Sequence, residues 1–98
     1  MKLLEGKTAI ITGGSRGIGK AIALQLAENG FDITLHCRTG IEQANEVAAQ
    51  IVALGRQVNI LQFDVCDREK AKLEIETDIS NNGAYYGVVC NAGLTRDM

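Results

Sequence analysis

Residues 12–19 read TGGSRGIG, so glycine recurs in this segment with the spacing G-x-x-x-G-x-G. Gly13 allows a sharp turn, Gly17 allows the backbone to approach a ligand, and Gly19 allows a helix to lie close to a sheet. A helix that begins at such a turn points its free N–H groups and the positive end of its dipole at an anion. The segment therefore predicts a cradle for the pyrophosphate of a dinucleotide.

The segments on either side of this turn have the patterns that such a cradle requires. Residues 7–12 form a short apolar, β-branched run, typical of a strand buried on both faces. Apolar residues then recur at helical spacing until Asn29-Gly30, which predicts the helix end; they include Ile18, Ala21, Ile22 and Leu26. A glycine-rich turn without a ligand is the alternative, but the order strand, turn, helix favours the nucleotide.

The end of the second predicted strand bears on the choice of cofactor, because a dinucleotide fold presents a side chain to the adenosine ribose there. An Asp or Glu would bind a free 2′-hydroxyl, but no acid follows this strand until Glu42. Arg38 can pair with a phosphate, Thr39 can donate its hydroxyl, and Arg16 adds a positive charge to the glycine turn. These residues favour NADP(H) over NAD(H). The alternative is that both arginines are solvated surface residues.

Further residues suit the adenosine side of such a site. Asp64 can accept a hydrogen bond from the exocyclic amine of adenine, and Val65 can pack on the ring. The alternative is that Asp64, together with Asp67, makes the polar contacts of a turn that leads into the next helix. His36 lies on a strand far from any nicotinamide, so we interpret it as a packing residue or a wall of the adenosine site. Small residues at 91–93 (NAG) stand where the ribose would pass, although alone they indicate only a turn.

Strand and helix patterns alternate along the whole chain. Strands are expected at residues 7–12, 31–37, 57–63 and 87–90. One helix runs from Ile41 to Leu54 and ends at Gly55; another is capped by Asp67 and has an apolar face of Ala71, Ile75 and Ile79. This alternation predicts right-handed crossovers and an α/β fold, a doubly wound parallel sheet with strand order 3-2-1-4.

Composition excludes several classes of protein. The 98 residues make at most one small domain, and a net charge of −2 gives no reason to expect binding to nucleic acid or to an anionic membrane. No apolar run has the roughly 18 residues of a membrane span, and no signal peptide precedes the first strand. Cys37, Cys66 and Cys90 lack metal-ligand spacing, so we expect small buried thiols in a reduced, cytoplasmic setting, with no metal site.

Four parallel strands make about half of a doubly wound fold. The strand at residues 87–90 would lie at an edge that further strands normally cover, and no Pro or Lys there opposes aggregation. We therefore expect residues 1–98 to be the N-terminal, NADP-binding part of a single domain in a longer protein. The alternative is a non-catalytic nucleotide-binding or interaction half-domain that pairs through this edge.

The glycine segment, residues 64–65 and residues 91–93 together resemble the short-chain dehydrogenase/reductase family, at the family's spacings and over the whole chain. Residues 91–97 (NAGLTRD) are similar to a stretch common in its bacterial 3-oxoacyl-[acyl-carrier-protein] reductases, and acetoacetyl-CoA reductases share it. The resemblance implies a Rossmann-type fold that holds the phosphates with Gly13, Ser15, Arg16, Gly17, Ile18 and Gly19. It also implies contacts of Arg38 and Thr39 with the 2′-phosphate, of Asp64 and Val65 with the adenine, and of Asn91, Ala92 and Gly93 with the adjoining ribose.

The resemblance further implies that NADPH reduces a 3-oxoacyl thioester, carried by acyl carrier protein or CoA, to the 3-hydroxyacyl product of fatty-acid elongation. The family is typically tetrameric, so a homo-tetramer is expected of the full-length protein. One departure is Cys90, which replaces the first Asn of the family's usual Asn-Asn-Ala-Gly and removes a hydrogen-bonding side chain near the sheet centre.

Hydride addition to a carbonyl develops an alkoxide that must be protonated or stabilised. The family takes its proton donor from a Tyr-x-x-x-Lys motif, aided by a Ser, and the resemblance places both beyond position 98. Tyr85 and Tyr86 are the only tyrosines in these residues, and neither has a Lys four positions later. We therefore expect no catalytic residue within residues 1–98, which alone should be inactive.

Overall fold

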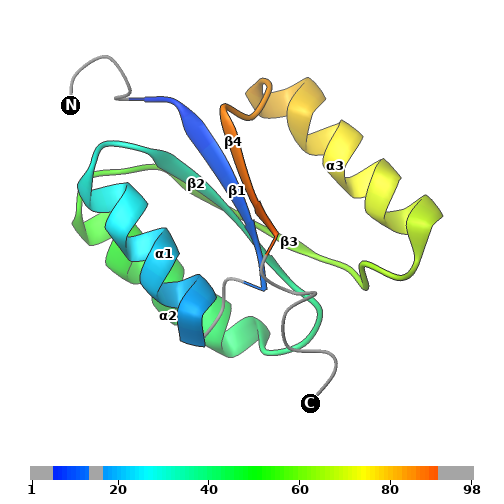
Figure 1. The fold of residues 1–98 in the computed structure, drawn as a ribbon, viewed down its shortest axis with the longest axis horizontal. Coiled ribbons are helices and arrows are strands. Elements are labelled where there is room, and N and C mark those ends of the chain that lie inside the picture. The colour runs from blue at the N-terminus through cyan, green and yellow to red at the C-terminus, as the bar shows by residue number, and fades with distance from the viewer. Residues whose placement is uncertain (1–5, 14–16, 91–98) are drawn as a thin grey trace.

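The computed structural model of the chain describes residues 6–13 and 17–90. They form one parallel sheet in the order β3-β2-β1-β4, with a helix between each strand and the next along the chain (Figure 1). The elements are β1 (Thr8–Thr12), α1 (Gly17–Glu28), β2 (Asp32–Cys37), α2 (Ile41–Ala53), β3 (Val58–Gln62), α3 (Arg68–Asn82) and β4 (Gly87–Cys90). The predicted α/β class and the strand order 3-2-1-4 are confirmed.

Helices cover both faces of the sheet. α1 and α2 lie side by side on one face, and α3 lies on the other (Figure 1). Successive residues of β1 divide accordingly: Ala9 and Ile11 belong to the apolar cluster on the side of α1 and α2, and Ile10 belongs to the cluster on the side of α3. All three are buried. β1 is therefore buried on both faces, as its continuous apolar run predicts.

The cluster on the side of α3 is the smaller one. Its buried members are Ile10, Leu61 and Phe63, against which Ala71, Ile75 and Tyr85 pack. The expected apolar face of α3 therefore holds for Ala71 and Ile75. It is wrong for Ile79, which is 37% exposed, because Asp78 occupies the buried position beside it with only 3% exposure. A carboxylate can occupy this buried position because it is hydrogen-bonded.

Asp78 joins several parts of the fold through its side chain. The carboxylate accepts hydrogen bonds from Thr34 Oγ1 on β2 (3.3 Å), Asn82 Nδ2 in α3 (2.9 Å) and Tyr85 OH before β4 (2.6 Å). It also accepts one from Asn59 Nδ2 on β3. These five residues, which we call the Asp78 cluster, attach the C-terminal half of α3 to the sheet where few apolar side chains are available.

Ionisation of Tyr85 should destabilise the fold. Burial, the hydrogen bond to Asp78 and the negative charge of Asp78 raise the pKa of Tyr85 above its ordinary value of 10.0. The folded state therefore keeps the phenol proton at pH values where the unfolded chain releases it. This contribution to the free energy of unfolding should be complete below about pH 10 and decline as the pH rises above that value.

Urea unfolding at a series of pH values between about 9 and 11 measures this decline. The Tyr85→Phe variant should show a shallower alkaline decline than the parent protein, because it has no phenol to titrate. Parallel declines in the two proteins would contradict the raised pKa of Tyr85.

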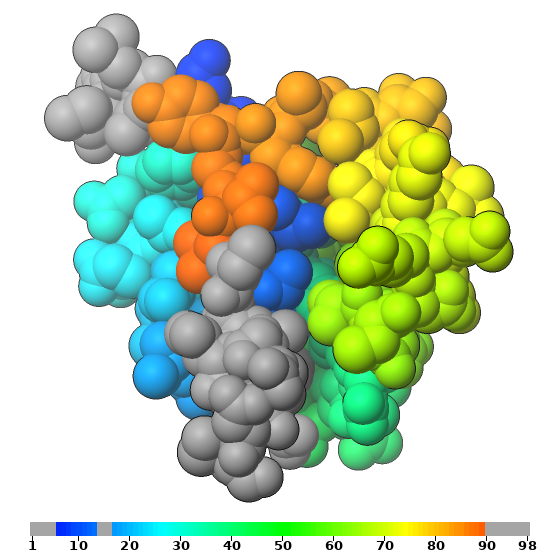
Figure 2. All heavy atoms as spheres, turned by 45° about the vertical axis from the view of Figure 1, so that its right-hand side comes forward, coloured from blue at the N-terminus to red at the C-terminus, as the bar shows by residue number. Residues whose placement is uncertain are grey.

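β4 forms an edge of the described sheet. It pairs with β1 in parallel, from the pair Ala9 and Gly87 to the pair Thr12 and Cys90. Its Val88 is 61% exposed. Figure 2 shows the strand, in orange, at the surface beside α3, in yellow. No second strand pairs with β4 within residues 6–13 and 17–90. The predicted open edge is therefore present in the described residues, whereas aggregation through it stays a prediction.

Candidate nucleotide-binding site

The carboxyl ends of the strands meet along one edge of the sheet. Thr12 at the end of β1 is level with Cys90 at the end of β4, and Cys37 at the end of β2 is level with Gln62 at the end of β3. The turns that follow β1, β2 and β3 therefore begin next to one another. Ligands of open α/β sheets bind at this edge.

Gly13 and Gly17 of the glycine turn lie within the described residues. Gly13 and Gly17 have φ values of 66° and 63°, in the left-handed region that side chains disfavour. A Cβ added to Gly17 would meet no atom within 4 Å, so the backbone there faces open space. Gly19 is buried within α1, whereas Ile18 is exposed. Gly17 thus leaves its backbone accessible at the start of α1, as a phosphate requires.

Arg38 and Asp64 approach each other across the turns after β2 and β3. Arg38 Nη1 lies 3.9 Å from Asp64 Oδ2, and the two side chains are 68% and 45% exposed. Gln62 Nε2 also donates to the backbone carbonyl of Arg38 at 3.3 Å. An exposed ion pair of this kind contributes little to stability. The guanidinium is therefore able to exchange this partner for an anionic ligand; Thr39 and Val65 beside the pair are exposed as well.

Asp64 also shapes the turn that leads into α3. Its Oδ1 accepts a hydrogen bond from the N–H of Cys66 at 2.9 Å. Asp67 caps α3 by accepting from the N–H of Lys70 at 3.2 Å, as predicted. The alternative role of Asp64, as a hydrogen-bonding residue of this turn, is thus confirmed. Its contact with adenine stays a prediction.

His36 lies between the glycine turn and the end of β3. The residue is 1% exposed, and its ring centroid lies 4.3 Å from that of Phe63. Nδ1 accepts a hydrogen bond from the N–H of Gly13 at 3.1 Å, and Nε2 bonds to the carbonyl oxygen of Phe63 at 2.7 Å. Burial lowers the pKa of His36, against the raising effects of the Phe63 carbonyl and the charge of Asp64.

Of the two interpretations of His36, the packing residue is confirmed and the wall of the adenosine site stays a prediction. Its bond to Gly13 was not predicted. The sequence does contain a signal for this bond. His36 is a polar residue near the end of the apolar strand β2, and β2 lies beside β1, which leads into the first glycine. In the parallel register Leu35 pairs with Ile11, so the imidazole of the next residue, His36, lies within reach of that glycine.

The thirteen predicted site residues divide according to what the structure describes. Ser15, Arg16, Asn91, Ala92 and Gly93 lie outside the described residues. The other eight all lie in, or directly after, the turns that follow β1, β2 and β3: Gly13, Gly17, Ile18, Gly19, Arg38, Thr39, Asp64 and Val65. Their roles toward a cofactor stay predictions.

The cysteines differ from one another. Cys37 is buried at the end of β2, as expected, and burial raises the pKa of its thiol. Cys66 is exposed, so the expectation of a buried thiol is wrong for this residue. It lies in the turn between β3 and α3, where its backbone N–H is bound by Asp64 and no apolar layer covers the side chain. The side chain of Cys90 lies outside the described part of the chain.

The two tyrosines lie at the other end of the sheet from the glycine turn. The backbone N–H of Tyr86 donates to the carbonyl of Thr8, at the start of β1, at 2.7 Å. Its ring lies 5.9 Å from that of Phe31, while Tyr85 binds Asp78. Within the described residues, no group of three or more His, Cys, Asp or Glu side chains could hold a metal ion. None of the helices described there is long and apolar enough to cross a membrane.

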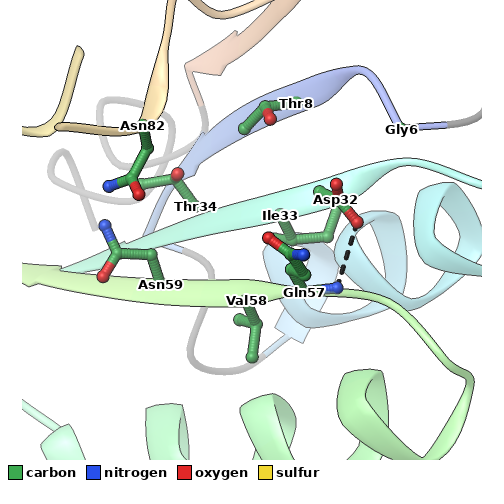
Figure 3. A pocket seen from close by; sticks show the side chains of 9 residues that line it. All are labelled: Gly6, Thr8, Asp32, Ile33, Thr34, Gln57, Val58, Asn59 and Asn82. Atoms are coloured by element: carbon green, nitrogen blue, oxygen red, sulfur yellow. Dashed lines mark hydrogen bonds between the residues drawn. The ribbon is translucent and has the colours of Figure 1, made fainter. Parts of the chain in front are cut away.

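A pocket of about 370 Å³ opens near the amino ends of the strands, between β2, β3 and the end of α3 (Figure 3). Polar side chains line much of it, among them Thr34, Asn59 and Asn82 of the Asp78 cluster. Figure 3 also shows the hydrogen bond from the N–H of Gln57 to Asp32 Oδ1, at 3.0 Å, on its wall. This pocket lies at the opposite end of the strands from the glycine turn and is distinct from the candidate nucleotide site.

Comparison with known proteins defines the class. The family model for short chain dehydrogenase matches residues 7–98, so the chain belongs to the short-chain dehydrogenase family. It is 57% identical over 91 residues to the 3-oxoacyl-[acyl-carrier-protein] reductase FabG of Aggregatibacter actinomycetemcomitans. The match covers 93% of this chain and 38% of that reductase. The predicted resemblance to bacterial 3-oxoacyl-[acyl-carrier-protein] reductases is thereby confirmed, and the chain spans well under half the length of this relative.

Solved structures agree with the fold. Carveol dehydrogenase from Mycobacterium avium, in complex with NAD, superposes with a TM-score of 0.82 at 29% identity, covering 91% of this chain and 36% of its own. A metagenomic short-chain oxidoreductase, in complex with NADP, gives a TM-score of 0.81 at 29% identity, covering 87% and 38%. Structural neighbours of this fold therefore hold either nicotinamide cofactor.

Proposed function

We propose that this chain is the N-terminal, NADP(H)-binding part of a reductase that converts 3-oxoacyl thioesters to 3-hydroxyacyl thioesters. The observation that carries the cofactor proposal is the left-handed, uncovered backbone of Gly17 at the start of α1, with an exposed arginine after β2. The substrate proposal rests on the 57% identity to a 3-oxoacyl-[acyl-carrier-protein] reductase. The acyl group would be carried by acyl carrier protein, with CoA as the alternative carrier.

The residues present fit a phosphorylated dinucleotide. Space beside Gly17 would receive a phosphate that a side chain would exclude. In this proposal the phosphates contact Gly13, Ser15, Arg16, Gly17, Ile18 and Gly19, and the 2′-phosphate contacts Arg38 and Thr39. Asp64 and Val65 contact the adenine, and Asn91, Ala92 and Gly93 contact the adjoining ribose. When bound, the cofactor supplies the hydride; these residues bind and orient it.

The proposal places proton transfer outside residues 1–98. A reduced carbonyl needs a proton donor, and the described tyrosines lie at the far end of the sheet. We therefore propose that a longer protein, a cytoplasmic homo-tetramer, provides the Tyr-x-x-x-Lys motif and its Ser. The experiment is NADPH oxidation by the full-length protein with acetoacetyl-acyl-carrier-protein, acetoacetyl-CoA and a simple ketone as substrates. Turnover fastest with the first supports the proposal, whereas turnover of the ketone alone, or of none, contradicts it.

Reversing the charge of Arg38 should change cofactor preference. In the full-length protein, Arg38→Glu should weaken NADP⁺ binding about tenfold or more, because a charge-assisted hydrogen bond to phosphate is lost and repulsion replaces it. NAD⁺ affinity should be unchanged or higher, since a carboxylate at this place can bind a free 2′-hydroxyl. Calorimetric titration with both cofactors measures the two affinities.

A matched control is Lys7→Glu, which makes the same change in net charge at the amino end of the sheet. Lys7 is exposed, and its Nζ lies 6.0 Å from the ring centroid of Tyr86. Both affinities should survive this substitution. Equal weakening of NADP⁺ and NAD⁺ in Arg38→Glu would show that Arg38 does not read the 2′-phosphate.

A further inference from the structure

His36 connects the glycine turn to the neighbouring strand end through two hydrogen bonds. Its Nδ1 is 3.1 Å from the backbone nitrogen of Gly13, and its Nε2 is 2.7 Å from the carbonyl oxygen of Phe63. At 1% exposure the ring has no access to bulk water. The side chain therefore reaches the first glycine of the turn from the interior of the sheet, on the side away from solvent.

The two partners define the protonation state of the ring. The backbone N–H of Gly13 can only donate a hydrogen bond, so Nδ1 must carry no proton. The carbonyl of Phe63 can only accept one, so Nε2 must carry the proton. A single form, the neutral Nε2–H tautomer, satisfies both. An imidazolium would direct an N–H at the N–H of Gly13, and that hydrogen bond would be lost.

The groups around His36 favour the neutral form. Gly13, directly after β1, presents its backbone N–H to the ring, and Phe63, directly after β3, presents its aromatic ring. Leu61 on β3 is the register partner of His36. The charged group that acts on His36 is Asp64, which favours protonation but is itself paired with Arg38 at 3.9 Å. Cys37, next on the same strand, has a raised thiol pKa and stays uncharged.

α3 packs over the same face of the sheet. It adds Ala71 and Ile75 to the cluster around Phe63. Its buried acid, Asp78, is hydrogen-bonded to Thr34, two residues before His36 on β2. That carboxylate is occupied by the Asp78 cluster and makes no bond to the imidazole.

We infer that His36 is a positioning residue: its neutral ring holds the N–H of Gly13 and thereby keeps the backbone of this glycine, directly after β1, in the conformation in which the site receives the pyrophosphate. Protonation of the ring releases this hold. The inference rests on the proposed function, because it assigns a determinant to the same dinucleotide site. It is also consistent with a pKa of His36 below 6.5, so dinucleotide affinity is constant above about pH 6.5 and falls as the pH drops below that value.

Two substitutions separate the contacts of the ring. His36→Asn keeps an acceptor near the place of Nδ1 and cannot titrate, whereas His36→Gln keeps a donor near the place of Nε2 and offers no acceptor to Gly13. Calorimetry of the full-length protein with NADP⁺ should give parent-like affinity for His36→Asn at pH 7.5 and affinity about fivefold weaker for His36→Gln, as for one lost hydrogen bond. As the pH drops below about 6.5, the affinity of the parent should fall relative to that of His36→Asn, by up to about fivefold once the ring is protonated. Titration of the ligand's own phosphate is common to both proteins and cancels in this ratio.

Nuclear magnetic resonance of the ligand-free parent protein provides a readout that needs no variant. The His36 ring should show a bare Nδ1 and a protonated Nε2, and the Gly13 amide shift should follow the His36 titration. Equal NADP⁺ affinity of the two variants, a ratio of parent to His36→Asn that stays constant after the ring has become protonated, or a protonated Nδ1 in the neutral ring would each overturn the inference. Failure of the parent to bind NADP⁺ at any pH is a different result, which would refute the proposed function instead.

Discussion

Replacing Gly17 by alanine is expected to weaken binding of NADP⁺ to the full-length protein by about tenfold to a hundredfold. Gly17 has φ 63° and faces open space, so an added methyl group meets no protein atom within 4 Å. The methyl group would instead occupy the approach to the backbone that we assign to the phosphates. Loss of one or two hydrogen bonds to a charged group accounts for an effect of this size. Calorimetric titration measures it directly.

Gly55 provides the matched control for this substitution. It too has a left-handed φ, 86°, with no atom within 4 Å of an added Cβ, but it lies between α2 and β3, away from the carboxyl ends of the strands. Gly17→Ala and Gly55→Ala should therefore lose similar stability, about 1 kcal/mol from backbone strain, while only Gly17→Ala loses affinity. If both variants bind NADP⁺ like the parent, the pyrophosphate does not lie against the glycine turn.

Replacing Asp78 by alanine is expected to lower the free energy of unfolding by about 3 kcal/mol or more. The substitution leaves the donors of the Asp78 cluster, Thr34, Asn59, Asn82 and Tyr85, without their shared acceptor. Each donor left unpaired at a buried or half-buried site lowers the free energy of unfolding by part of the contribution of one hydrogen bond. Few apolar side chains attach α3 to the sheet, so little packing compensates for the loss. Urea unfolding provides the measurement.

Two further variants show whether the cluster is responsible. Tyr85→Phe removes one donor and should cost about 1–2 kcal/mol. Glu76→Ala removes an exposed carboxylate from the same helix and should change stability by less than about 0.5 kcal/mol. An Asp78→Ala variant as stable as Glu76→Ala would mean that the cluster does not anchor α3.

The elements of this fold were predictable because each depends on a local pattern. The apolar run at residues 7–12 anticipates β1 (Thr8–Thr12) to within one residue. Asp67 was expected to cap α3, and its side chain does accept from the N–H of Lys70. The strand order follows from the same patterns, since right-handed crossovers leave few ways to arrange four parallel strands.

The interior of the α3 side was not predictable in this way. Helical spacing favoured Ile79 for the buried face, yet Asp78 is buried and Ile79 is partly exposed. What decides the outcome is a set of donors contributed by β2, β3, α3 and the segment before β4. Partners so far apart along the chain leave no periodic trace in any one segment.

The candidate site shows the same division. The glycine spacing alone predicts a sharp turn at Gly13 and an accessible backbone at Gly17, and both residues have a left-handed φ. The pairing of Arg38 with Asp64 depends on the register of β2 and β3, which residue types do not reveal. The bond between His36 and Gly13 depends in the same way on the register of β1 and β2.

The most direct test of the central claim is a calorimetric titration of the full-length protein with NADP⁺ and, separately, with NAD⁺. The glycine turn with Arg38 beside it predicts saturable binding of one nucleotide per subunit, with NADP⁺ bound about tenfold or more tightly than NAD⁺. Saturable binding of neither nucleotide would contradict the assignment of the site. Tighter binding of NAD⁺ would contradict the role assigned to Arg38.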